Sequence, residues 1–232
     1  MPRDLQGEGQ DLTETPDRPL VRLRVWDLPT RAVHWLLVVL IPFSWWSAQS
    51  DHLPWHRLSG YTILGLLIFR LTWGLVGSPT ARFSRFLRGP SAVGAYLRGR
   101  LAPPIGHNPL GGWSVAAMLT VLAAQIILGL FSVDEDSLEA GPLSKFVSFD
   151  TGRAIAHAHH IVFWVLLGLI ILHLAAIAVY ALRGRNLVWP MVTGIVGVGP
   201  SLPPPVSSSW RALATAAAAA GATWIIAHGF RL

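Results

Sequence analysis

Four long apolar stretches without a single carboxylate restrict the fold of this chain more than any other feature. They cover about residues 32–49, 56–77, 113–132 and 154–182. Each approaches or exceeds the roughly 20 residues with which a helix crosses a bilayer. The sequence therefore predicts an all-α integral membrane protein with a four-helix transmembrane bundle. A weaker, Ala-rich stretch at 210–229 predicts a fifth, C-terminal transmembrane helix.

Charge and cysteine content narrow the function further. The net charge of +6 suits either a nucleic acid or an anionic membrane surface. Because only 13% of the residues are charged and 52% are hydrophobic, membrane lipid is the expected partner and nucleic acid is not. The chain has no cysteine, which excludes disulfides, thiolate-bound iron–sulfur clusters, Cys-based zinc sites and covalent c-type haem.

Basic residues in the loops predict the orientation. Arginines are frequent before residue 32, between 78 and 112 and after 182, whereas the 50–55 loop has no basic residue and the 133–153 loop is acidic. Cytoplasmic loops carry the excess of Lys and Arg. We therefore expect a multi-pass protein with a cytoplasmic N-terminus, and a fifth span would place the C-terminus on the outer side.

The titratable residues inside the predicted spans are cations and imidazoles. Such residues are costly in a membrane and indicate function. A proton-coupled transporter usually needs a carboxylate in its path, so its absence from the spans disfavours that class. Neutral imidazoles that face the interior of a helical bundle are suitable axial ligands for b-type haem.

The spacing on the fourth span selects two histidines. His159 and His173 lie 14 residues apart, which is about 21 Å along a helix and within roughly 40° of whole turns. The two rings therefore share one helix face at two membrane depths. The neighbouring His157 and His160 fail this test against His173. Two haem groups stacked across the bilayer would need such an arrangement.

Each haem needs a second ligand from another helix at a matching depth. His34 opens the first span on the cytoplasmic side and matches His173, while His56 opens the second span on the outer side and matches His159. The sequence therefore predicts an inner haem between His34 and His173 and an outer haem between His56 and His159. His52 in the short outer loop is a rival to His56.

Other polar and aromatic residues leave alternatives open. Arg70 lies near the predicted depth of the inner haem and either binds a haem propionate or a quinone headgroup, or reaches toward the lipid headgroups. Gln125 is placed to hydrogen-bond a quinone or another helix. Six tryptophans are assigned to an interfacial belt: Trp45, Trp46, Trp55, Trp73, Trp113 and Trp189.

Several short motifs resemble the bacterial cytochrome b561 and nickel–iron-hydrogenase b-type cytochrome family. They are Val25–Arg31 running into His34-Trp35, Trp55-His56 with Gly60, Phe69-Arg70-Leu71 with Trp73-Gly74, Gly106–Trp113, and His159 with His173. The resemblance covers about residues 22–195. It differs at His160, where many members have Glu, and in the fifth span.

The resemblance implies a four-helix core in the bacterial inner membrane that binds two haem b groups through His34, His56, His159 and His173. It also implies electron transfer between the quinone pool and a periplasmic partner, either a c-type cytochrome or a dehydrogenase or hydrogenase subunit. Whether the chain has quinone oxidoreductase activity of its own stays open.

The chain is expected to divide into four parts. These are a polar cytoplasmic arm at 1–31, the haem-binding four-helix core at 32–186, a Pro/Gly/Ser-rich linker at 187–209 and the accessory fifth helix at 210–232. Two other functions are open to a chain of this kind. A His-based metal-ion transporter would need a polar path, and a redox-inactive anchor or assembly subunit would bind no haem.

Overall fold

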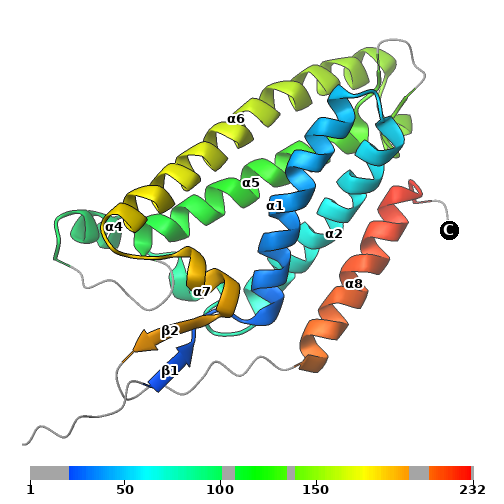
Figure 1. Ribbon diagram of the computed structural model, residues 1–232. Coiled ribbons are helices and arrows are strands. Elements are labelled where there is room, and N and C mark those ends of the chain that lie inside the picture. The colour runs from blue at the N-terminus through cyan, green and yellow to red at the C-terminus, as the bar shows by residue number, and fades with distance from the viewer. Residues whose placement is uncertain (1–20, 101–107, 135–138, 199–208, 231–232) are drawn as a thin grey trace, which may run out of the picture.

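The computed structural model describes residues 21–100, 108–134, 139–198 and 209–230 (Figure 1). Four of its helices are long and apolar enough to cross a membrane: α1 Leu28–Gln49, α2 Leu53–Val76, α5 Pro109–Phe131 and α6 Phe149–Leu182. They correspond in order to the four predicted spans, so the prediction of a four-helix membrane bundle is confirmed.

Each of these helices begins three to five residues before the expected apolar stretch. For α1, α5 and α6 the reason is a polar residue just before the helix that caps its first turn, whereas α2 has no side-chain cap. The Asp27 side chain accepts a hydrogen bond from the Thr30 backbone N–H and so caps α1, and Asn108 and Ser148 cap α5 and α6 in the same way. The expected boundary at residue 31 therefore falls inside α1.

The helices form two pairs joined through α2. Helix α1 packs along α2, and α5 packs along α6, while α2 also contacts α5 and α8, the C-terminal helix Ser209–Ala227 (Figure 1). Helix α2 is therefore the central element, and 44% of its most apolar stretch is buried, against 6% for α6.

A buried apolar layer lies at the middle of the bundle. It consists of Ile63 and Leu67 of α2, Leu122 of α5 and Leu166 of α6. A second cluster, around Phe69 and Trp73, lies toward the C-terminal end of α2, and a third joins Leu64 to Leu130 and Leu143. The interior is therefore closely packed at mid-depth.

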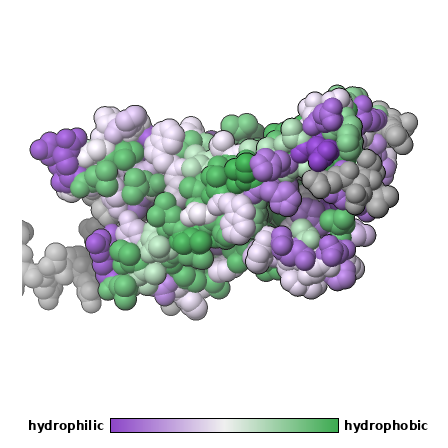
Figure 2. All heavy atoms as spheres, turned by 90° about the horizontal axis from the view of Figure 1, so that it is seen from above, coloured by the Kyte–Doolittle hydropathy of each residue, from purple (hydrophilic) through white to green (hydrophobic). Residues whose placement is uncertain are grey.

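The outer surface of the bundle is apolar as well. Trp164 and Leu172 of α6 are 63% and 65% exposed, and the mean hydropathy of the helix reaches 2.7. Figure 2 shows hydrophobic residues gathered over the middle of one face and hydrophilic residues at both ends. A helix that is hydrophobic all round yet exposed is suited to a lipid environment.

A small antiparallel sheet ties the two flanking segments together. Strand β1, Val21–Arg24, pairs with β2, Ile195–Val198, which follows the short helix α7, Val188–Thr193. These elements lie within the expected arm and linker, where the sequence indicated no regular structure. The link is reinforced because Trp35 Nε1 donates to the Met191 carbonyl at 3.1 Å and Arg31 donates to the Val192 carbonyl.

Shorter helices complete the connections: α3 Phe83–Phe86, α4 Pro90–Leu97 and the 3-10 helix η1 Ser144–Phe146. Helix α4 is fixed to the end of α6 by a hydrogen bond of 3.0 Å between the Tyr96 and Tyr180 hydroxyls. Asn108, which caps α5, donates to the same Tyr180 hydroxyl at 2.8 Å. Helix α4 and the N-cap of α5 are thus both held against the end of α6.

Helix α8 runs along α2 over the length of the bundle. Near its start, Ala212 packs against the cluster that contains Phe69 and Trp73, and Ala219 in the middle of α8 belongs to that cluster. At its end, the Gly229 carbonyl accepts a hydrogen bond from Lys145 Nζ in the loop between α5 and α6. The two ends of α8 therefore lie at opposite ends of the bundle.

Candidate functional site

His56 of α2 and His159 of α6 lie next to each other, although 103 residues separate them in the sequence. Their ring centroids are 6.2 Å apart and the ring planes are nearly perpendicular, at 89°. Both side chains line a cavity of about 390 Å³ between α1, α2, α5 and α6. The structure thus brings together the two residues predicted as the outer pair.

Hydrogen bonds fix the tautomer of both imidazoles. His56 Nδ1 lies 2.8 Å from the Ser44 carbonyl, and His159 Nδ1 lies 2.9 Å from the Gln125 carbonyl. A carbonyl oxygen only accepts hydrogen bonds, so each Nδ1 carries the proton. Each Nε2 is therefore left with a lone pair, the arrangement by which a second contact prepares histidine to bind a metal.

The cavity wall is apolar and leaves room for a flat group. Ile63, Leu122 and Phe163 contribute apolar surface, and Gly60 faces open space, since a Cβ built there would meet no atom within 4 Å. Pockets of a few hundred cubic ångströms with few polar groups are typical of cofactor sites.

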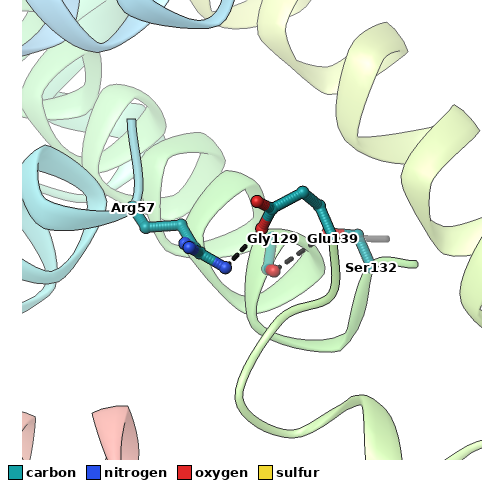
Figure 3. Close-up of polar contacts among 4 residues, drawn as sticks. All are labelled: Arg57, Gly129, Ser132 and Glu139. Carbon is teal, nitrogen blue, oxygen red and sulfur yellow. Dashed lines mark hydrogen bonds and ion pairs between the residues drawn. The ribbon is translucent and has the colours of Figure 1, made fainter. Parts of the chain in front are cut away.

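The mouth of the cavity is charged. Arg57 of α2 forms an ion pair with Glu139 of the loop between α5 and α6 (Figure 3). The same close-up shows Ser132 Oγ donating to the Gly129 carbonyl at 3.0 Å, which fixes the start of that loop. Arg57 and Glu139 both line the cavity, so this face combines an apolar interior with an outward-lying cation.

These residues fit a b-type haem. His56 and His159 would hold its iron, because neutral imidazoles with Nε2 lone pairs are the ligands that haem takes from histidine. The apolar walls suit the macrocycle, and Arg57 at the mouth suits a propionate.

For His34 of α1 and His173 of α6, the predicted inner pair, an electrostatic interaction is the one observation that relates them, and their pairing stays a prediction. His34 Nδ1 is buried without a hydrogen-bond partner, and the ring stands edge-on to Trp35 at 5.1 Å. A buried polar atom without a partner is rare and needs an explanation. His34 therefore lacks the second contact that holds each of the two outer rings.

The mid-bundle layer separates the two pairs. Leu166 lies seven residues after His159 and seven before His173, and Ile63 lies seven after His56. Both belong to the same buried apolar cluster. The two His pairs therefore lie on either side of a packed apolar layer.

Arg70 is 5% exposed. Its guanidinium lies 3.4 Å from the Ala81 carbonyl and 5.0 Å from the centre of the Phe83 ring, and Asp27 is within electrostatic range. Arg70 therefore interacts with the segment that follows α2 and with the residue that caps α1. Its role toward a haem propionate or a quinone stays a prediction.

Other histidines and Gln125 take different places. His52 precedes α2, is exposed and does not line the cavity, whereas His160 is exposed at the cavity edge. His157 is exposed, and His107 lies outside the described residues. Gln125 forms a hydrogen bond with His159 on the neighbouring helix. This is the helix-to-helix contact that was predicted as the alternative to a quinone contact.

One expectation was wrong. Trp73 does not belong to an interfacial belt: it is 1% exposed, and its Nε1 donates to Asp27 at 2.9 Å. An indole N–H this deep needs an acceptor, and the Asp27 carboxylate supplies it. The other five tryptophans of the predicted belt are 45% to 63% exposed.

The sequence did not single out Ser44, Arg57 or Gly129 as parts of the site. Ser44 contacts His56 through its backbone carbonyl, a group that every residue has and that the sequence therefore cannot single out. A Cβ at Gly129 would lie 3.0 Å from His159 Cε1, a proximity that depends on how α5 packs on α6. Arg57 follows His56 directly, and this adjacency was the one signal available.

An apolar helical bundle that places two imidazoles from separate helices next to each other defines a membrane protein suited to an imidazole-ligated cofactor. A family model described as prokaryotic cytochrome b561 matches residues 25–194. The chain therefore belongs to the prokaryotic cytochrome b561 family, as its motifs predicted.

Membership implies haem b binding and electron transfer in a membrane. The match takes in α1 to α7 and ends before α8. Searches among curated proteins and among solved structures found no match to the chain.

Proposed function

We propose that this chain is a diheme cytochrome b that carries electrons across the bacterial inner membrane between a periplasmic redox partner and the quinone pool. His56 and His159 would hold the outer haem, and His34 and His173 the inner one. The single observation that carries the proposal is the outer pair, in which two helices present adjacent imidazoles with both Nδ1 atoms bound to backbone carbonyls.

Bound haem supplies reversible one-electron chemistry at its iron. The chain's own residues do the rest. Ser44 and Gln125 hold the two outer rings through their carbonyls, which keeps each Nε2 unprotonated. Leu122 and Leu166 exclude water from the space beneath, because they belong to the buried mid-bundle layer. Arg57 stands at the mouth in an ion pair with Glu139, and its remaining guanidinium N–H groups would be donors for a propionate.

The orientation follows from charge and from the path of α8. The basic loops lie before α1, between α2 and α5, and after α6, which assigns that end to the cytoplasm. Helix α8 starts at that end and finishes against Lys145 at the other. We therefore infer a cytoplasmic N-terminus and a fifth span with its C-terminus outside.

Two features support the proposed partners, a periplasmic electron carrier and a quinone. Asp134 and Glu139 lie at the outer end of the bundle beside the cavity mouth, where carboxylates would attract a basic periplasmic electron carrier. Arg70 is the buried cation toward the cytoplasmic end of α2, and a quinone headgroup or haem propionate there would find a charged donor. The direction of flow is set by the two potentials.

The test is a reduced-minus-oxidised absorption spectrum of the purified chain, with pyridine haemochrome quantitation. Two protohaems per chain are expected. His56→Ala and His159→Ala should each remove the same haem, and His34→Ala and His173→Ala the other. His157→Ala, an exposed neighbour on α6, should keep both and serves as the matched control.

Other outcomes would separate the alternatives. A single haem that survives loss of His34 or His173 would contradict the inner pair. A chain with no Soret band would support the metal transporter or the redox-inactive subunit instead. Among the described residues, no group of three or more His, Asp or Glu side chains is placed to hold a metal ion.

A further inference from the structure

Gln125 of α5 contacts both ring nitrogens of His159. Its backbone carbonyl lies 2.9 Å from His159 Nδ1, and its side-chain Nε2 lies 3.0 Å from His159 Nε2. Since the carbonyl makes Nδ1 the protonated nitrogen, Nε2 is the acceptor and the carboxamide donates to it. One residue thus fixes the tautomer of the ring and also occupies its lone pair.

The other end of the same carboxamide has no partner. Gln125 is 8% exposed and lines the cavity, and its Oε1 is buried without a hydrogen bond. Leaving a buried amide oxygen unpaired is unfavourable. The orientation of the Gln125 side chain is therefore set by the hydrogen bond that its Nε2 donates to His159, because its Oε1 makes no hydrogen bond.

Gly129, one turn further along α5, completes the contact. A Cβ there would lie 3.0 Å from His159 Cε1 and 3.4 Å from Nδ1. The ring consequently lies against the backbone of α5 between Gln125 and Gly129. Although α5 contributes no histidine to the cavity, it determines how His159 is oriented.

An imidazole nitrogen has a single lone pair, so a carboxamide donor and a metal ion cannot both take His159 Nε2. We propose that Gln125 is a positioning residue for the outer ligand whose side chain competes with haem: it holds His159 in the ligating tautomer and must release Nε2 as haem binds. This inference rests on the proposed function, in which His159 is that ligand.

Competition predicts effects of opposite sign on folding and on haem capture. Replacing Gln125 with leucine keeps the backbone carbonyl but removes the carboxamide. Haem-free chain should then unfold at a lower temperature, because Nε2 loses its donor. Haem should bind the outer site about fivefold more tightly, the factor that corresponds to one net protein hydrogen bond. A side chain that served only the fold would lower both.

The experiment uses full-length chain produced under haem limitation, purified in detergent and titrated with haemin at the Soret band. A His34→Ala background removes the inner site, so that one site is observed. Gln125→Leu is compared with the parent, and Gln125→Met is the second variant if the leucine form is not recovered. Thr120→Leu is the matched control, since Thr120 lies on the same helix α5 but is exposed and does not line the cavity.

Tighter binding by the Gln125 variant, with unchanged binding by the Thr120→Leu control, would support the inference. Equal or weaker binding by Gln125→Leu would overturn it, whatever happens to its unfolding temperature. A parent chain that binds no haem would instead overturn the proposed function. The two failures are therefore distinguishable.

Discussion

At the scale of single residues, one buried polar side chain, that of Asp27, connects several segments of the structure. Asp27 is 2% exposed, yet it caps α1 through the Thr30 N–H and accepts from Trp73 Nε1 and Ser78 Oγ. The carboxylate thereby joins the start of α1 to the end of α2, seven residues before His34. The motif around Asp27 indicated a family, but only the fold reveals these partners.

Replacing Asp27 with alanine should destabilise the chain by about 3 kcal/mol. The change removes a helix cap and leaves the buried Trp73 N–H without an acceptor. Unfolding of the detergent-solubilised protein, followed by circular dichroism, measures the loss. Asp150→Asn, at an exposed position in the first turn of α6, is the control and should cost under about 1 kcal/mol. Equal losses in the two variants would contradict this role of Asp27.

At the scale of elements, one face of each spanning helix packs inside the bundle, and the remaining surface is exposed where lipid would lie. Leu166 and Leu172 both lie on α6, but Leu166 is 3% exposed and Leu172 is 65% exposed. Composition cannot distinguish them, because α6 is apolar on every side. The distinction comes from the layer that Leu166 shares with Ile63, Leu67 and Leu122.

Leu166→Ala should therefore destabilise the bundle by about 3 kcal/mol, the usual effect of emptying a packed leucine site. Leu172→Ala on the same helix should change the stability by less than about 0.5 kcal/mol. Chemical unfolding in mixed detergent micelles compares the two variants directly. If Leu172→Ala proved as costly as Leu166→Ala, the assignment of the two faces would be wrong.

At the scale of the whole molecule, α8 lies outside the part of the chain that the family model matches. The family match ends at residue 194, and α8 packs mainly on α2, while Ile226 and Gly229 at its end reach Leu130 of α5 and the loop between α5 and α6. The cavity is lined by residues of α1, α2, α5, α6 and the loop between α5 and α6, and no residue of α8 takes part. The fifth helix thus covers a face of α2 without entering the described site.

Truncation after residue 208 should leave the haem content of the chain unchanged and lower its unfolding temperature. The first result follows because the cavity loses no lining residue, and the second because Phe69, Trp73 and Leu64 lose apolar cover. Pyridine haemochrome and thermal scans measure both quantities. Loss of both haems on truncation would show instead that α8 is part of the haem-binding core.

The sequence by itself determined the membrane class, the four spans, the family and the set of candidate histidines. Each of these follows from local patterns: apolar length, the absence of carboxylates from the spans, and helical spacing between His159 and His173. The capped helix starts at Asp27, Asn108 and Ser148 were also visible as residue types, although the apolar stretches alone placed the helix starts too late.

The tertiary structure alone decided which atoms hold those histidines. The Ser44 and Gln125 carbonyls, the approach of Gly129 to His159 and the pairing of β1 with β2 all join segments distant in sequence. Backbone groups are chemically alike at every position, so no residue pattern marks the ones that will face an imidazole. Trp73 illustrates the same limit, because a tryptophan near a helix end suits the membrane interface or the core equally until Asp27 is placed beside it.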